Sequence, residues 1–300
     1  MRTLGPAMGG IAVGGIMGHV VRADAALFGR IGRDRTRVVE TPSGAVLSWA
    51  ALHLLAEHGY RWRPSGEPER PDAPVGDLLH VDLTIEHAPS GRLVLGATPA
   101  RFLQAFGRTV TYAPDESAEP WSSSELTARA ERRAPTPTTV VVGSADDAVG
   151  GILVVERGPR TVFETLRVVV AIRDRRTVRD GLEAGLQSVS LGRHPQSGLF
   201  STSRGRLDGV TDPVLRGPTT PLAVFAGARA VRARDLAGRA ADLGGRPVGS
   251  ARAPGFVFWF AGDEPDRWRA AADLARGVRG SGLRRTPSAR DDDNRTGEVR

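Results

Sequence analysis

The chain has 300 residues, 40% of them hydrophobic, with a net charge of +7, 41 basic residues that are all arginine, and no cysteine. The missing lysine excludes Walker-type phosphate loops, pyridoxal phosphate enzymes, protein kinases and Ser-x-x-Lys acylases. The missing cysteine excludes disulfides, cysteine nucleophiles, iron–sulfur clusters and cysteine-ligated zinc. Function is left to Asp, Glu, His, Ser or Arg side chains, with a divalent metal still open as a cofactor.

The residue bias indicates a high-GC bacterial genome. Glycine occurs 37 times and proline 21 times, whereas asparagine occurs once, at Asn294. Such a genome raises arginine without selecting for an anionic partner, and the 34 acidic residues are interspersed among the arginines. Nucleic-acid binding is therefore an alternative rather than the favoured interpretation. The same bias raises the alternative that the reading frame is not a genuine folded gene product, against which the apolar periodicity argues.

Residues 1–30 form a glycine-rich apolar segment. The run from residue 5 to residue 21 is uncharged, and Gly10, Gly14 and Gly18 are spaced four apart. In a membrane helix this spacing allows close approach of a partner. The run is short for a membrane span and rich in helix-weakening glycine. We expect a cytoplasmic protein, with an exported or membrane-anchored form as the alternative.

Residues 31–113 are expected to form an N-terminal α+β half. A helix is predicted up to Gly59, and its residues His53 and Glu57 form an exposed pair one turn apart. The following strand alternates aromatic and basic residues, which places Arg61 and Arg63 together on one face as candidate anion-binding residues.

The segment 79–87 is the richest in chemical groups. Apolar and polar residues alternate, so a strand would turn His80, Asp82 and Glu86 to the face opposite the core. A histidine and a carboxylate two residues apart can share a metal ion or perform acid–base chemistry. The alternative is an antiparallel strand with one face in water. A turn at residues 89–91 predicts that 92–95 pairs with this strand as a hairpin.

A helix over 99–106 and a strand over 108–112 follow in the predicted N-terminal half. Residues 114–138 are rich in proline and serine and are expected to link two halves, with a short helix inside the linker.

Residues 139–280 are expected to form a C-terminal α/β half with a more parallel sheet. Strands are predicted over 139–142 and 151–155, and a helix over 178–189. Residues 162–170 have helical spacing, although their many β-branched residues leave a strand open. The segment 194–217 is expected to be a long irregular loop, in which Arg204 and Arg206 are candidate anion-binding residues.

The last elements are a strand over 222–225, a helix over 235–243, an apolar strand over 256–260 and a final helix. Asp263 and Glu264 follow the apolar strand. They are candidate acids or metal ligands at a strand end, or residues that cap the final helix. Residues 281–300 are rich in Arg and Asp and are expected to be a disordered tail.

The predicted fold class is α/β or α+β, with a mixed sheet in two parts: an antiparallel-leaning N-terminal half and a more parallel C-terminal half. No catalytic constellation is complete, so the favoured function is a non-catalytic partner-binding or structural protein. A metal- or acid–base-dependent hydrolase using His80, Asp82 and Glu86 with Asp263 or Glu264 is one alternative. An Arg-based nucleic-acid or anion binder is the other.

Overall fold

The computed structural model describes residues 13–14, 20–21, 37–41, 47–58, 60–64, 74–115, 118–190, 194–211, 219–233, 236–238, 240 and 242–280. Most of the predicted segment 1–30 and all of the predicted tail 281–300 lie outside the described residues. Within the described part of the chain, no helix is both long and apolar enough to cross a membrane.

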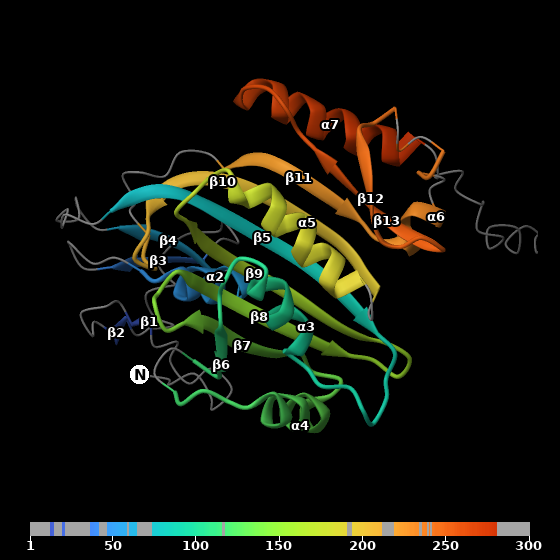
Figure 1. Cartoon of the computed structure of the whole chain (residues 1–300). Helices are drawn as coiled ribbons and strands as arrows, with labels where there is room; N and C mark the ends of the chain where they lie inside the picture. The colour runs from blue at the N-terminus through green and yellow to red at the C-terminus, as the bar shows by residue number, and fades with distance from the viewer. Residues whose placement is uncertain are drawn as a thin grey trace, which may run out of the picture.

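One antiparallel sheet of nine strands dominates the fold (Figure 1). Its strand order is β12-β13-β11-β10-β5-β9-β8-β7-β6, and every neighbouring pair is antiparallel. The strands are β5 (Val75–His87), β6 (Val110–Ala113), β7 (Thr138–Ser144), β8 (Val149–Arg157), β9 (Val162–Ile172), β10 (His194–Arg206), β11 (Thr220–Ala226), β12 (Gly245–Ser250) and β13 (Ala253–Trp259).

Two short strand pairs lie outside this sheet. β1 (Val13–Gly14) pairs antiparallel with β2 (Val20–Val21), and β3 (Arg37–Thr41) pairs parallel with β4 (Tyr60–Pro64). The strand predicted after Gly59 is therefore confirmed.

Six helices are described. They are α2 (Trp49–Glu57), α3 (Ala97–Gln104), α4 (Ser123–Arg133), α5 (Thr177–Ser190), α6 (Ala228–Ala233) and α7 (Glu264–Gly280). Ser48 accepts a hydrogen bond from the Ala51 amide and caps α2, and Ser122 and Glu125 form a capping box that starts α4.

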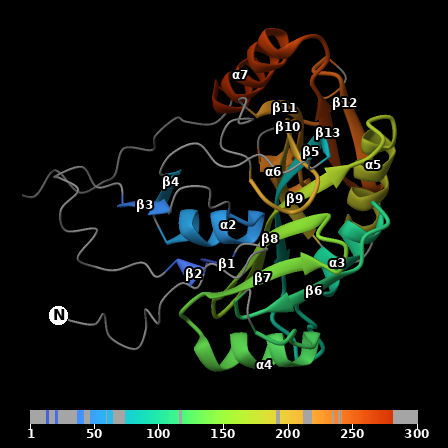
Figure 2. The same cartoon turned by 90° about the vertical axis from the view of Figure 1, so that its left-hand side faces the viewer.

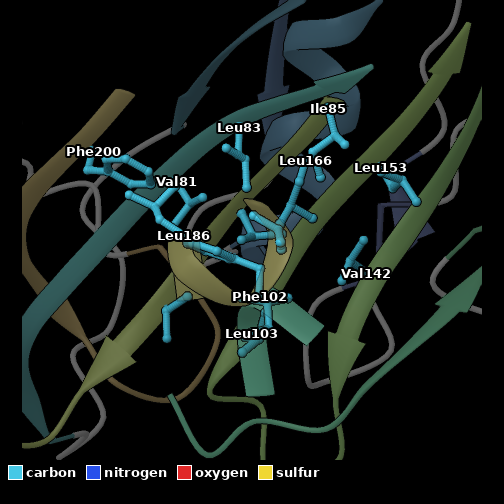
Figure 3. Packing of buried hydrophobic residues seen from close by; sticks show 14 of the residues in the cluster. Val81, Leu83, Ile85, Phe102, Leu103, Val142, Leu153, Leu166, Leu186 and Phe200 are labelled. Carbon is cyan, nitrogen blue, oxygen red and sulfur yellow. The ribbon is translucent and has the colours of Figure 1, made fainter. Parts of the chain in front are cut away.

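The main core lies between one face of the sheet and helices α3 and α5. Alternate residues of β5, including Val81, Leu83 and Ile85, turn to this face and are buried, as predicted. They meet Phe102 of α3 and Leu186 of α5 (Figure 3). Burial of these side chains supplies the largest favourable term in folding.

The opposite face of the sheet is covered at two places. Helix α2 packs on β7, β8 and β9 through Ala50 and Leu54, and α7 packs on β11 through Leu274. Figure 2 shows α2 on one side of the sheet, with α3 and α5 on the other. The middle strands β5 and β10 lie between these two covered areas.

The predicted parallel C-terminal half is wrong, because the strands over 139–280 belong to the antiparallel sheet. Both faces of β8 are covered, and most of its residues are therefore apolar. Such a continuous apolar run is typical of parallel strands, but it also occurs in this antiparallel strand because β8 is buried on both sides. Strands from both predicted halves join this one sheet, since β6 pairs with β7 across the predicted linker.

Four local expectations also need correction. Residues 162–170 form a strand rather than a helix, and 194–206 form a strand rather than a loop. Residues 92–95 form no strand, because β5 pairs instead with β9 and β10. The described residues between 236 and 244 contain turns where a helix was predicted.

Candidate functional site

The polar face of β5 continues onto β10, and no described helix covers this surface. We define the β5–β10 strip as six of the side chains that these two strands turn to the α2 side of the sheet. They are His80, Asp82, Thr84, Leu199, Ser201 and Ser203. Leu199 lies opposite Asp82 and is 51% exposed, whereas its neighbour Phe200 is completely buried on the other face. The predicted alternation of β5 therefore places a polar surface in the middle of the sheet.

A charged network borders this strip on the side of α2. Arg167 of β9 forms an ion pair with Glu57 of α2, and its Nε lies 3.6 Å from Asp82 Oδ2. Asp82 and Arg167 face each other directly in the strand register. The predicted exposed carboxylate Glu57 is thus held against the sheet by an arginine that sequence spacing did not connect to it.

His80 takes part in a hydrogen bond across two strands. Its Nε2 lies 2.8 Å from Ser203 Oγ on β10. The pKa of His53 on α2 is lowered to about 4. Burial is the largest cause, and the nearby His80 and Arg167 lower it further through their charges. His53 is therefore neutral at pH 7.

The pKa of Asp82 is shifted upward, in contrast to that of His53. Burial raises the pKa of its carboxyl group, the Arg167 guanidinium opposes this change, and the charge of Glu57 adds to it. A raised carboxyl pKa is one property of acid–base residues, but structural networks produce it as well.

The predicted third member of the hydrolase site lies elsewhere. Glu86 is at the end of β5, where both of its carboxylate oxygens accept hydrogen bonds from Arg229 of α6 at 3.1 Å. His80, Asp82 and Glu86 thus each have a different partner. Among the described residues, no group of three or more His, Asp or Glu side chains is placed to hold a metal ion.

Asp263 and Glu264 lie at the start of α7. The Asp263 Oδ1 accepts a hydrogen bond from the Asp266 amide at 3.1 Å, which is the geometry of a helix cap, and Glu264 is exposed in the first turn. This outcome supports the capping alternative for Asp263.

Two of the four predicted anion-binding arginines have acidic partners. Arg204 Nη1 lies 3.7 Å from Asp77, and Arg206 is buried against Asp208, to which its Nε donates at 3.0 Å. The side chains of Arg61 and Arg63 lie outside the described residues. An anion at Arg204 or Arg206 would compete with these carboxylates.

Sequence reasoning missed a buried hydrogen-bonded pair, His87 and Glu164. His87 Nε2 lies 2.6 Å from Glu164 Oε2, and both side chains are fully buried. The Gly96 amide donates to Glu164 Oε1 at 2.5 Å, and the Tyr112 hydroxyl donates to the Gly96 carbonyl at 2.6 Å. Burial, followed by the charge of Glu164, raises the pKa of Tyr112 far above its usual range. His87 occupies a position that the alternation of β5 assigns to an apolar residue. This departure from the pattern was a sequence signal for a buried polar contact.

Comparisons with known proteins give a family and a distant structural likeness. No curated protein matches the chain. Among solved structures, the Pseudomonas aeruginosa T6SS protein PA0821 resembles it with a TM-score of 0.43 and 12% identity, over 72% of this chain and 75% of that one. The family model described as "DUF6177, C-terminal domain" matches residues 78–280, which contain the nine-stranded sheet apart from the first three residues of β5, and helices α3 to α7. The chain belongs to the DUF6177 family.

Proposed function

We propose that this chain is a non-catalytic binding protein that holds a partner protein on the β5–β10 strip. The observation that carries the proposal is the position of Leu199, an apolar side chain that is 51% exposed in the middle of a sheet whose other face is buried. A protein-binding surface combines apolar contact area with a polar rim, and Leu199 supplies the apolar area within this polar strip.

The groups around Leu199 fit a protein partner. Ser201 and Ser203 on the same strand supply hydroxyl groups, and Asp82 supplies a carboxylate. Such groups can exchange hydrogen bonds with the backbone and side chains of a partner while its apolar side chain covers Leu199. Among the described residues, α2 and α7 cover the sheet on either side of this strip.

The charges of the strip favour a protein over a nucleic acid. A nucleic acid is held mainly by cations that neutralise its phosphates. Arg167 already pairs with Glu57 and Asp82, and Arg204 lies near Asp77. A polyanion would have to displace these carboxylates, whereas a mixed protein surface would not.

The geometry gives less support to the hydrolase alternative. His80 pairs with Ser203, Asp82 with Arg167 and Glu86 with Arg229, so the three predicted groups do not converge on one point. Acid–base chemistry needs its groups within hydrogen-bond reach of one substrate atom.

Quantitative co-purification from the native host tests the proposal. The bait is the full chain, either unaltered, with Leu199→Arg, or with Val94→Arg as a matched control. Val94 is 44% exposed in the loop between β5 and α3. We expect at least one protein to be retained by the unaltered chain and by Val94→Arg and to be lost with Leu199→Arg. Identical sets from all three baits would overturn the proposal.

A further inference from the structure

A second candidate site lies at the end of β5, beyond Thr84 of the β5–β10 strip. A cavity of about 320 Å³ that opens to solvent is lined by the end of β5, the turn between β8 and β9, the last residue of α5, helix α6, and residues of β10, β11, β12 and β13. Its volume is at the lower limit for pockets that hold small molecules. The polar and charged residues of its wall that matter here are Glu86, His87, Arg160, Ser190, Arg229 and Arg232.

The charged part of this wall is mainly positive. Arg160, Arg229 and Arg232 contribute three guanidinium groups, whereas Glu86 contributes a single carboxylate. Glu86 is occupied by Arg229 at 3.1 Å. Within the described part of the chain, Arg160 and Arg232 form no ion pair with a carboxylate. These two side chains are the groups in the wall that an incoming anion can recruit.

Buried polar atoms in the same wall lack partners. The imidazole of His87 is fully buried, and its Nε2 is held by Glu164 at 2.6 Å. Its Nδ1 has no hydrogen-bond partner among the described residues, and the same is true of the buried Oγ of Ser190. Leaving a buried polar atom unsatisfied costs about 1–3 kcal/mol. Both atoms lie behind the cavity surface rather than on it, so they present no hydrogen bond to the open cavity.

Glu164 fixes the orientation of His87 within this wall. The carboxylate is held in turn by the Gly96 amide, so the imidazole is anchored from its buried side. The cavity also has apolar lining from Phe225 and Val248. The wall therefore combines positive charge with an apolar surface.

We infer that this cavity binds a small molecule that carries an oxyanion group, a phosphate or a carboxylate, next to a short apolar part. Arg160 and Arg232 pair with the oxyanion, because guanidinium groups match phosphate and carboxylate geometry. The apolar part covers Phe225 and Val248. This inference does not depend on the proposed partner at the β5–β10 strip.

Isothermal titration calorimetry of the full chain tests the inference with three probes of similar shape: phenyl phosphate, benzoate and the uncharged benzamide. We expect saturable binding of one or both anions and none of benzamide. Binding of phenyl phosphate alone assigns a phosphoryl ligand, and binding of benzoate alone assigns a carboxylate; either outcome supports the inference. Absence of binding by both anions, or equal binding of benzamide, overturns it.

Variants locate the binding to this cavity. Arg160→Gln and Arg232→Gln each remove one exposed guanidinium, and we expect affinity to fall about tenfold, the size of one charged hydrogen bond. Glu86→Gln releases Arg229 and should tighten binding about threefold, the size of an exposed ion pair. Arg129→Gln, at an exposed site on α4, is the matched control and should leave affinity unchanged. Equal losses in Arg129→Gln and Arg232→Gln would place the binding elsewhere and overturn the inference.

Discussion

His87 and Glu164 are 77 residues apart in the sequence, yet their side chains meet at 2.6 Å in the fully buried interior. The pair joins β5 to β9, the two strands at the centre of the sheet. Because Glu164 also accepts from the Gly96 amide, the carboxylate satisfies a backbone group that would otherwise be buried without a partner.

Removal of one member of this pair should be strongly destabilising. We expect His87→Ala to lower the free energy of unfolding by about 3–5 kcal/mol, because it leaves the Glu164 carboxyl group buried without its partner. Glu164→Gln should cost about 1–2 kcal/mol, since the amide oxygen can still accept from Gly96. Urea unfolding of both variants measures the difference. Equal, small losses would contradict the buried pair.

Stability should fall in mild acid because of His53. Its pKa in the folded state is lowered to about 4, against an ordinary value of 6.5, so the unfolded chain binds more protons between these values. The resulting loss of stability grows as the pH falls from 6.5 through 4, and it amounts to at most about 3–4 kcal/mol. Urea unfolding at pH 7, 5.5 and 4.5 should show a steeper decline for the natural chain than for His53→Gln. Parallel declines would refute this role for His53.

The alternation of β10 can be tested with two adjacent residues. Phe200 is completely buried, and its ring lies 6.2 Å from that of Phe102, whereas Leu199 is 51% exposed. Phe200→Ala should cost about 3–5 kcal/mol, and Leu199→Ala should change stability by less than about 0.5 kcal/mol. Thermal unfolding compares the two. Similar effects would mean that this segment lacks the alternating faces of a strand.

Close contact between α3 and α5 depends on a glycine. A Cβ at Gly185 would lie 2.9 Å from the Phe102 ring and 3.2 Å from the Phe102 carbonyl oxygen. Gly185→Val should therefore destabilise by about 1–3 kcal/mol through overpacking. Gly143→Ala is the control, because a Cβ at Gly143 has no atom within 4 Å. Differential scanning calorimetry should show a lower Tm for Gly185→Val alone; equal shifts would contradict the close packing.

Local patterns predicted much of the secondary structure. The strict alternation of residues 79–87 identified both the strand and its buried face, and helical spacing identified α5. The spacing of apolar residues predicted a helix at Val162–Ile172, but these residues form a strand, as their many β-branched side chains favour. Residues 194–206 were predicted to be a loop because glycine, serine and arginine are weak strand formers. They form a strand because they pair with β5 and β11 on either side.

The candidate sites were less accessible to sequence reasoning, because their contacts join distant segments. Arg229 reaches Glu86 across 143 residues, and Arg167 reaches Glu57 across 110. Local spacing correctly placed His80 and Asp82 on one face, but it carries no information on which arginine or serine comes to meet them.

Photo-crosslinking in the native host tests the proposed binding surface most directly. A photoreactive residue replaces Leu199 in one variant and Val94 in the other, two apolar sites with similar exposure. We predict a discrete cross-linked product with another protein from position 199 and none from position 94. The same products from both positions, or products that the purified chain forms with itself alone, would contradict the proposal that the β5–β10 strip holds a partner protein.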